Sequence, residues 1–209
     1  MEPMKPEVTT PNTKAVKPKI LYYGTPVVLL NTWNEDETTN ISPISSSWAL
    51  GYTVVLGLGV GGKALENIKR HGECVLNLPD PSLWEQVERL APYTGKDPVP
   101  DSKRSMGFSY QKDKFRVSGL TEAASVTVKP SRILECPLQL EAVVKHIRIP
   151  EHAPEFAVVE TEVLHVHAHE RIVLGEHHID PAKWSPLLYN FRHYFGLGQA
   201  LGKNFRAER

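Results

Sequence analysis

Residues 138–169 read LQLEAVVKHIRIPEHAPEFAVVETEVLHVHAH. The two segments on either side of residues 150–155 are long, contain many β-branched residues and alternate apolar with polar side chains, as half-buried strands do. The connection over residues 150–155 contains two prolines and is typical of a hairpin turn. The stretch therefore predicts two long antiparallel strands, over residues 138–149 and 156–169.

Shorter strands are predicted elsewhere in the chain. They cover residues 26–33, 38–44, 52–59, 73–78, 125–128 and 172–174. Helices are expected at residues 63–72, where Gly72 ends the helix, and from about Ser82 to Leu90. With roughly six to eight strands and only two or three short helices, the sequence favours a mainly β fold. We expect an antiparallel barrel with a few peripheral α-helices rather than a doubly wound sheet.

Residues 92–118 form a long polar connection between the predicted elements. Such a length is unusual for a loop without structure and often carries function. A small helix is expected near Ser102–Met106. The basic residues at 103–104 and 112–116 are expected to lie on a solvated face.

The 209 residues fit one domain over 20–209, preceded by an arm over residues 1–19 that is rich in Pro, Lys and Thr. We expect this arm to be flexible. The formal net charge of zero argues against nucleic acid as a partner. No apolar run is long enough for a membrane helix, and no signal peptide is apparent. Two widely spaced cysteines, Cys74 and Cys136, indicate a reducing cytoplasm.

Residues 38–48 read TTNISPISSSW and place three hydroxyls, Ser45, Ser46 and Ser47, directly before Trp48. Hydroxyls and backbone amides at a strand end can donate to a phosphate or to the edge of a planar cofactor. The indole of Trp48 offers an aromatic face or a ring donor. An ordinary serine-rich turn is the alternative interpretation of this block.

Residues 57–63 read GLGVGGK and open the helix predicted at 63–72. Glycines let a ligand approach the backbone, a helix N-terminus attracts anions, and Lys63 adds a positive charge. The spacing matches neither the Rossmann nor the P-loop pattern, so an ordinary glycine turn is the alternative. One strand separates this block from the serines, and in an antiparallel arrangement both blocks could border one groove that suits a phosphate.

Four blocks follow one another in a characteristic order: Asn40–Trp48, Leu56–Gly59, Lys63–Ile68 and Gly72–Leu78. Leu187–Tyr189, Arg192 and Tyr194–Gly198 follow near the C-terminus. Together, over roughly residues 25–200, these blocks resemble the flavin reductase-like family, which includes flavoredoxin-like proteins.

The resemblance implies an antiparallel split β-barrel and a homodimer that binds FMN non-covalently near the subunit interface. By position, the FMN-binding residues would be Ser45, Ser46, Ser47, Trp48, Gly59, Val60, Gly62 and Lys63. The serines and Trp48 would contact the flavin and its ribityl-phosphate, Gly59 and Val60 would approach through their backbone, and Gly62 and Lys63 would help bind the phosphate. Ala64 stands where the family often has a hydroxyl residue, so one phosphate hydrogen bond would be missing.

The resemblance also implies an NAD(P)H-dependent flavin reductase, with NADH or NADPH as the reductant. For the basic residues at 103–104 and 112–116, guiding a nicotinamide phosphate is then the alternative to a solvated face. No catalytic residue is assigned, because the flavin carries the hydride chemistry and the protein supplies position and electrostatics. The alternative within the family is an FMN-bound electron carrier of the flavoredoxin type, with a redox partner protein in place of the nicotinamide.

His165, His167 and His169 alternate along the predicted strand and therefore share one face. Histidines at this spacing can share a metal, which makes a metal-dependent barrel enzyme a third hypothesis. The favoured interpretation is a solvent or interface face without a metal, and a role near the flavin or nicotinamide is the other alternative. Arg192 and Tyr194, in the aromatic tail, are expected either to line the flavin or to dock the C-terminal segment on the barrel.

Overall fold

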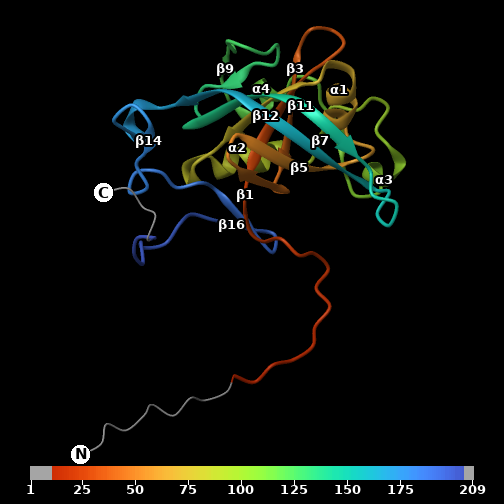
Figure 1. The fold of residues 1–209 in the computed structure, drawn as a ribbon. Helices are drawn as coiled ribbons and strands as arrows, with labels where there is room; N and C mark the ends of the chain where they lie inside the picture. Colours follow the sequence, from red (N-terminus) through yellow and green to blue (C-terminus); the bar gives the residue numbers. More distant parts are fainter. Residues whose placement is uncertain (1–10, 205–209) are drawn as a thin grey trace, which may run out of the picture.

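The structure, a computed structural model, describes residues 11–204 (Figure 1). Residues 11–19 are exposed, contain no helix or strand and extend away from the folded body. Residues 1–10, the rest of the predicted arm, lie outside the described range. Within residues 11–204, no helix has the length and apolar content needed to cross a bilayer.

Seven strands form one curled antiparallel sheet in the order β3-β2-β6-β11-β12-β5-β4. Their bounds are β2 Val28–Trp33, β3 Thr39–Ile44, β4 Ser47–Leu50, β5 Thr53–Gly59, β6 Glu73–Leu78, β11 Leu138–Arg148 and β12 Phe156–Ala168. The long hairpin predicted from the sequence is β11–β12, and it pairs Leu138 with Ala168 and Arg148 with Val158. The mainly β fold with an antiparallel half-barrel sheet and few helices is therefore confirmed.

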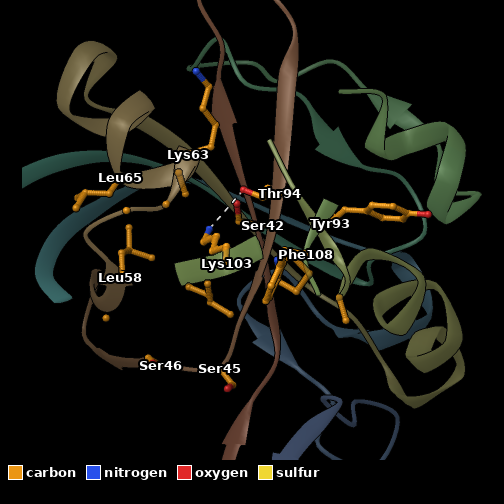
Figure 2. A pocket seen from close by; sticks show the side chains of 18 of the residues that line it. Ser42, Ser45, Ser46, Leu58, Lys63, Leu65, Tyr93, Thr94, Lys103 and Phe108 are labelled. Atoms are coloured by element: carbon orange, nitrogen blue, oxygen red, sulfur yellow. Dashed lines mark hydrogen bonds between the residues drawn. The ribbon is translucent and has the colours of Figure 1, made fainter. Parts of the chain in front are cut away.

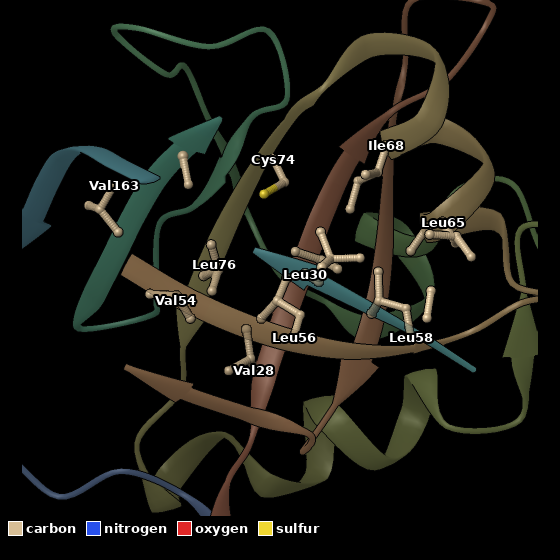
Figure 3. Close-up of a cluster of buried hydrophobic side chains, with 14 residues drawn as sticks. Val28, Leu30, Val54, Leu56, Leu58, Leu65, Ile68, Cys74, Leu76 and Val163 are labelled. Atoms are coloured by element: carbon tan, nitrogen blue, oxygen red, sulfur yellow. The ribbon is translucent and has the colours of Figure 1, made fainter. Parts of the chain in front are cut away.

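The main hydrophobic core fills the inside of the curl (Figure 3). Strand residues such as Leu30, Leu56 and Leu76 meet Leu65 and Ile68 from α1 (Lys63–His71), and each of them is almost fully buried. Helix α1 lies on the sheet because its apolar residues recur at helical spacing on one face. It ends where Gly72 adopts the left-handed conformation, at φ 67°, and donates to the carbonyl of Ile68, as the glycine at this position predicts.

A second apolar cluster lies on the other side of β2 and is built around Leu29, Val87 and Leu90. It is covered by α2 (Trp84–Leu90) and α4 (Lys114–Ser118). A 3₁₀ turn at Pro81–Leu83 comes before α2, and a four-residue helix, α3 (Asp101–Arg104), lies between α2 and α4. These helices hold the polar connection of residues 92–118 against the barrel.

Short strand pairs complete the fold. Strand β1 (Tyr23–Pro26) pairs with β15 (Leu188–Asn190), which pairs with β16 (His193–Phe195). The remaining pairs are β7 (Tyr93–Thr94) with β8 (Ser109–Tyr110), β9 (Glu122–Ala123) with β10 (Arg132–Ile133), and β13 (Val173–Leu174) with β14 (His178–Ile179). A second 3₁₀ turn spans Glu170–Ile172. The connection over 92–118 thus contains β7, β8 and two helices.

The strand predicted at residues 125–128 is wrong, because this segment forms a loop. The backbone N–H groups of Val126 and Thr127 donate to the carboxylate of Glu141, at 2.8 and 2.6 Å, rather than to a neighbouring strand. The β-branched residues of this segment indicate a strand, but its backbone N–H groups find their acceptor in the buried carboxylate of Glu141 instead of in a neighbouring strand.

Candidate functional site

A cleft of about 680 Å³ opens beside the barrel (Figure 2). Most of its lining comes from four parts of the chain: the serine segment at 42–46, the turn and helix start at 57–65, the connection over 93–108, and tyrosines from both ends of the domain. Single residues, among them Lys114 and Glu155, complete it. The volume lies within the range of about 300–1,000 Å³ that is typical of small-molecule sites. This cleft is the candidate binding site.

Six of the eight residues predicted to bind the cofactor line this cleft: Ser45, Ser46, Gly59, Val60, Gly62 and Lys63. Ser47 and Trp48 line a smaller hollow of about 360 Å³ instead, beside Tyr23 and Thr25. They begin the edge strand β4, where Ser47 pairs with Leu56 of β5. Ser46 lines both hollows, and the residues after it turn from the cleft into the smaller hollow.

The N-terminus of α1 forms one end of the cleft. Its N-cap residue, Gly62, supplies no side-chain cap, and Lys63, Ala64 and Leu65 all line the cleft. Among residues 11–204, the N–H groups of these three residues have no hydrogen-bond acceptor, as expected for a first helical turn. A Cβ at Gly62 would lie 3.1 Å from the carbonyl oxygen of Gly59, so the turn is tight. Unpaired N–H groups and the helix dipole make this end suitable for an anion.

The ammonium of Lys63 points away from the cleft (Figure 2). It donates to both carboxylate oxygens of Glu35, at 2.9 and 2.8 Å, and to Glu66 at 2.8 Å. Donation from Lys63, joined by Arg70, lowers the pKa of Glu35 to about 2. Lys96 pairs with the other oxygen of Glu66. Lys63 therefore contributes its backbone to the cleft, whereas its charge belongs to an ion-pair network on the outer side of α1.

Lys103 supplies the cation that Lys63 does not. Its Nζ donates to Oγ1 of Thr94 at 3.4 Å and would lie 4.0 Å from a Cβ at Gly62, directly beside the start of α1 (Figure 2). It also lies 5.8 Å from the ring centroid of Phe108. Burial, with the nearby charge of Lys96, lowers the pKa of Lys103. The prediction that residues 103–104 lie on a solvated face is wrong for Lys103, which the fold of residues 92–118 turns into the cleft.

A second lysine, Lys114, also lines the cleft. It is 2% exposed, so the prediction that residues 112–116 lie on a solvated face is wrong for this lysine, whose Nζ donates to the carbonyl of Ile41 at 2.7 Å. Burial, with a further contribution from Lys103, lowers its pKa to about 7. Neither Lys103 nor Lys114 forms an ion pair with any residue in 11–204. The cleft therefore contains two lysines without a protein counter-ion, which favours an anionic ligand.

The low pKa of Lys114 predicts a pH-dependent stability. Between pH 7 and its ordinary value of 10.5, the unfolded chain holds more protons at this position than the folded protein, so the free energy of unfolding rises with pH. In Lys114→Met this titration is absent. The free energy of unfolding of wild type minus that of the variant is expected to rise by about 1.5 kcal/mol from pH 7 to about pH 8.5. Urea unfolding without added ligand measures both values. A difference that stays constant over this window would show that Lys114 titrates normally.

Tyrosines form a further part of the lining. Tyr22, Tyr189 and Tyr194 all line the cleft, and the ring centroid of Tyr189 lies 5.5 Å from that of Tyr22 and 5.6 Å from that of Tyr194. The hydroxyl groups of Tyr22 and Ser46 are hydrogen bonded at 3.0 Å. The hydroxyl of Tyr194 donates to Glu88 at 2.9 Å. Tyr194 packs against the second apolar cluster and lines the cleft, so the C-terminal segment docks on the folded body as expected. Arg192 does not line the cleft.

The histidine face lies outside the cleft. Nε2 of His167 is 2.7 Å from Glu141, the rings of His165 and His167 are 4.4 Å apart, and His169 contacts the carbonyl of Leu134. Within residues 11–204, no three His, Cys, Asp or Glu side chains lie together in a group that could hold a metal ion. The described side chains therefore give no support to the metal-enzyme hypothesis.

Cys74 and Cys136 are free thiols buried in the two apolar clusters. Burial raises the pKa of Cys74 to about 12, and the pKa of Cys136 is also well above its ordinary value for the same reason. Both therefore stay protonated and act as core residues rather than as nucleophiles.

Comparison with known proteins places this chain in a family. A family model described as "Flavin reductase like domain" matches residues 20–198. The protein YdfE of Bacillus subtilis (strain 168), itself uncharacterized, is 61% identical over 195 residues, which cover 93% of this chain and 94% of YdfE.

Solved structures show the same fold. Flavoredoxin of Desulfovibrio vulgaris (Miyazaki F) superposes with a TM-score of 0.77 at 21% identity, covering 94% of this chain and 99% of that one. Flavoredoxin from Methanosarcina acetivorans has a TM-score of 0.72 at 18% identity, covering 94% and 97%. A Shewanella frigidimarina protein with a split barrel domain has a TM-score of 0.69 at 19% identity, covering 88% and 87%. With its curled antiparallel sheet and a family model that matches residues 20–198, this chain is a split-barrel member of the flavin reductase like family.

Proposed function

We propose that this protein binds FMN non-covalently in the cleft and acts as an NAD(P)H-dependent flavin oxidoreductase of the reductase type. One observation carries the proposal: the unpaired N–H groups of α1 and the ammonium of Lys103 meet at one end of a cleft whose wall contains Ser45 and Ser46. This combination suits a ligand with a phosphate at one end and a polar chain leading away from it. The family match supports a flavin as that ligand.

In this proposal the phosphate lies between Gly62 and Lys103. The N–H groups of Lys63, Ala64 and Leu65 donate to it, and the ammonium of Lys103 adds a charge-assisted hydrogen bond. The cleft fits such a group because the three N–H groups have no acceptor among residues 11–204, and Lys103 has only a long hydrogen bond of 3.4 Å to Thr94. Ala64, which lacks a hydroxyl, still contributes its backbone N–H.

The ribityl chain and the flavin ring would follow the serine segment. Ser45 and Ser46 line the cleft, where Ser46 is hydrogen bonded to Tyr22, and Gly59 and Val60 would approach the ligand through their backbone. A side chain at Gly57 would lie 2.9 Å from Cβ of Ser46, so this part of the wall is closely packed. When bound, FMN would supply the hydride chemistry, and the protein would supply its position and the electrostatics around it.

We also propose a homodimer. The edge strand β4 and its turn into β5 expose three large apolar side chains, Trp48, Leu50 and Tyr52, at 58%, 75% and 70%. An uncovered sheet edge with apolar side chains favours association with another chain. Ser47 and Trp48, which lie in the hollow beside this edge, would then reach a flavin only through such an interface. A reducing cytoplasm suits the two free thiols.

An electron carrier is the second candidate. The two flavoredoxins among the solved structures favour it, since their fold covers nearly all of this chain. Such a protein would hold FMN in the same cleft but would exchange electrons with a redox partner protein instead of a nicotinamide.

Titration of the purified protein with FMN, followed by anaerobic addition of NADH or NADPH, tests the function. Saturable FMN binding and loss of the visible flavin absorbance on adding a nicotinamide are the expected results. Binding without reduction by either nicotinamide would favour the electron carrier. Absence of FMN binding would contradict both proposals.

Lys103→Met is expected to weaken FMN binding about tenfold, or about 1.4 kcal/mol, because the phosphate loses a charge-assisted hydrogen bond. Lys63→Met is the matched control, since its ammonium already pairs with Glu35 and Glu66 outside the cleft. The sequence alone assigns this effect to Lys63. Flavin fluorescence titrations of both variants, with melting temperatures as a check on folding, decide between the two lysines. A larger loss in Lys63→Met than in Lys103→Met would reverse the assignment.

A further inference from the structure

Lys114 is a buried amine that faces the cleft without a counter-ion. Its side chain projects from α4, is 2% exposed and donates from Nζ to the carbonyl of Ile41 at 2.7 Å. An ammonium carries more than one N–H donor, but among residues 11–204 this carbonyl is the acceptor that hydrogen bonds to it. A neutral carbonyl does not balance a buried positive charge, so burial favours the uncharged amine.

The charged groups around α4 do not supply that counter-ion. β3, which packs against α4, has no titratable side chain between Thr39 and Ile44. From α2, Arg89 donates to the carbonyl of Ser118 on α4. The carboxylates of these and neighbouring segments already have other partners: Glu85 pairs with Arg89, Glu88 with Tyr194, Asp113 with Arg116, Asp36 with Lys112, and Glu66 with Lys63 and Lys96. The charge that acts on Lys114 is that of Lys103, and it is repulsive.

Lys114 faces the end of the cleft where the phosphate is proposed to bind. Both lysines line the cleft, and the charge of Lys103 is close enough to lower the pKa of Lys114. Ser42, which follows the carbonyl that Lys114 binds, lies beside Thr94 and Lys103 (Figure 2). Glu155 also lines the cleft, but within residues 11–204 its carboxylate neither pairs with Lys114 nor shifts the pKa of that lysine. A ligand phosphate would therefore meet two amines here.

We propose that the cleft takes up a proton at Lys114 when it binds a dianionic phosphate monoester, which gives the site a second cation beside Lys103. The inference rests on the proposed function, since FMN is a ligand of this class. Without ligand, burial and the repulsion by Lys103 keep a large share of the amine neutral. A phosphate with two negative charges reverses this balance, because each ammonium then offsets one of them and donates to a phosphate oxygen. The proton comes from the solvent, and none passes to the flavin.

The proton uptake has a defined pH dependence. The pKa of Lys114 in the ligand-free cleft is about 7, so uptake per FMN should rise from about half a proton at pH 7 to about one near pH 8.5. The phosphate of FMN contributes little over this range, because the second pKa of a phosphate monoester is about 6. Binding that consumes a proton weakens as the pH rises. The dissociation constant of FMN should therefore increase about tenfold from pH 7 to about pH 8.5.

Isothermal titration calorimetry of FMN into the full chain tests the proposal. In phosphate-free buffers that differ in ionisation enthalpy, the slope of the observed enthalpy against that ionisation enthalpy counts the protons taken up. In Lys114→Met the slope is expected to be close to zero, and the dissociation constant should not change with pH. Lys103→Met is the matched control, since it should bind FMN more weakly but still take up a proton near pH 8.5. Riboflavin, which lacks the phosphate, should bind to the wild type without proton uptake.

The remaining outcomes also decide the question. Wild-type binding whose enthalpy is the same in every buffer near pH 8.5 would overturn the proposal. Uptake that persists in Lys114→Met but is lost in Lys103→Met would overturn it too, because the proton would then belong to Lys103. If Lys114→Met fails to fold, the wild-type pH series and Lys103→Met still test the uptake. Absence of FMN binding to the wild type would refute the proposed function, whereas FMN binding without proton uptake refutes this inference alone.

Discussion

Glu141→Ala is expected to lower the free energy of unfolding by about 3 kcal/mol or more. The carboxylate of Glu141 is fully buried and accepts hydrogen bonds from the N–H groups of Val126 and Thr127 and from the hydroxyl of Thr127. It also lies 2.7 Å from Nε2 of His167. Alanine would remove the acceptor of these donors, whose own residues Val126 and Thr127 are exposed, and would release the loop at residues 125–130 from the sheet. Urea unfolding of the two proteins measures the difference.

Glu141→Gln is the matched control, since it keeps the shape of the side chain and removes the charge. Burial by itself would raise the pKa of Glu141, but hydrogen bonds from Thr127, from the backbone of Val126 and from His167 outweigh it and lower the pKa to about 2. The stability gained from the carboxylate is thus present above pH 4.5 and lost as the pH falls toward 2. The difference in free energy of unfolding between wild type and Glu141→Gln should therefore become smaller as the pH falls from 4.5 toward 2. An Ala variant as stable as wild type would mean that the loop is held by other contacts.

The strands were predictable because burial on one face sets a period of two along the sequence. The alternation over residues 138–149 and 156–169 gave β11 and β12 to within one residue, and Gly72 marked the end of α1. The segment at 125–128 shows the limit of this rule. Its β-branched residues fit a strand, but which acceptor the backbone finds depends on Glu141, a residue on another element that local pattern does not reveal.

The sequence predicted which segments of the chain border the candidate site, but only partly which side chains point into it. The serine segment and the glycine–lysine turn border one cleft because β5 joins them through antiparallel pairing. The direction of a long, flexible side chain is not set by such pairing. Glu66, three residues after Lys63, is a local signal that this ammonium has a partner on the helix. Glu35 is the second partner and is visible only in the folded protein.

Lys103 and the tyrosines that line the cleft were harder to predict from the sequence. Lys103 reaches α1 only because β7 and β8 pair and turn residues 92–118 back onto the barrel. Tyr189 and Tyr194 lie beside Tyr22 because β15 pairs with β1, more than 160 residues earlier in the chain. Contacts of this kind depend on long-range topology, and a single sequence carries no periodic signal for them.

Gly95→Ala is expected to weaken FMN binding about a hundredfold and to destabilise the protein by about 1–3 kcal/mol. A Cβ at Gly95 would overlap Oδ1 of Asn40 and lie 3.2 Å from Cγ of both Asn40 and Lys63. Asn40 cannot move easily, because it is 2% exposed and its amide donates to Ser42 at 3.0 Å. The chain at residue 95 would have to move outward instead, and it would carry Thr94 away from α1.

Gly61→Ala separates this steric effect from the general cost of adding a methyl group. Gly61 lines the same cleft, but a Cβ there would meet no atom within 4 Å. Because Lys103 bonds to Thr94, displacement at residue 95 removes both the hydroxyl and the ammonium from the phosphate end. Lys103→Met removes the ammonium alone, so Gly95→Ala should lose more FMN affinity than Lys103→Met, and Gly61→Ala almost none, in parallel flavin titrations. If Gly95→Ala matched Gly61→Ala in both affinity and melting temperature, the connection over 92–118 would not form a rigid wall of the site.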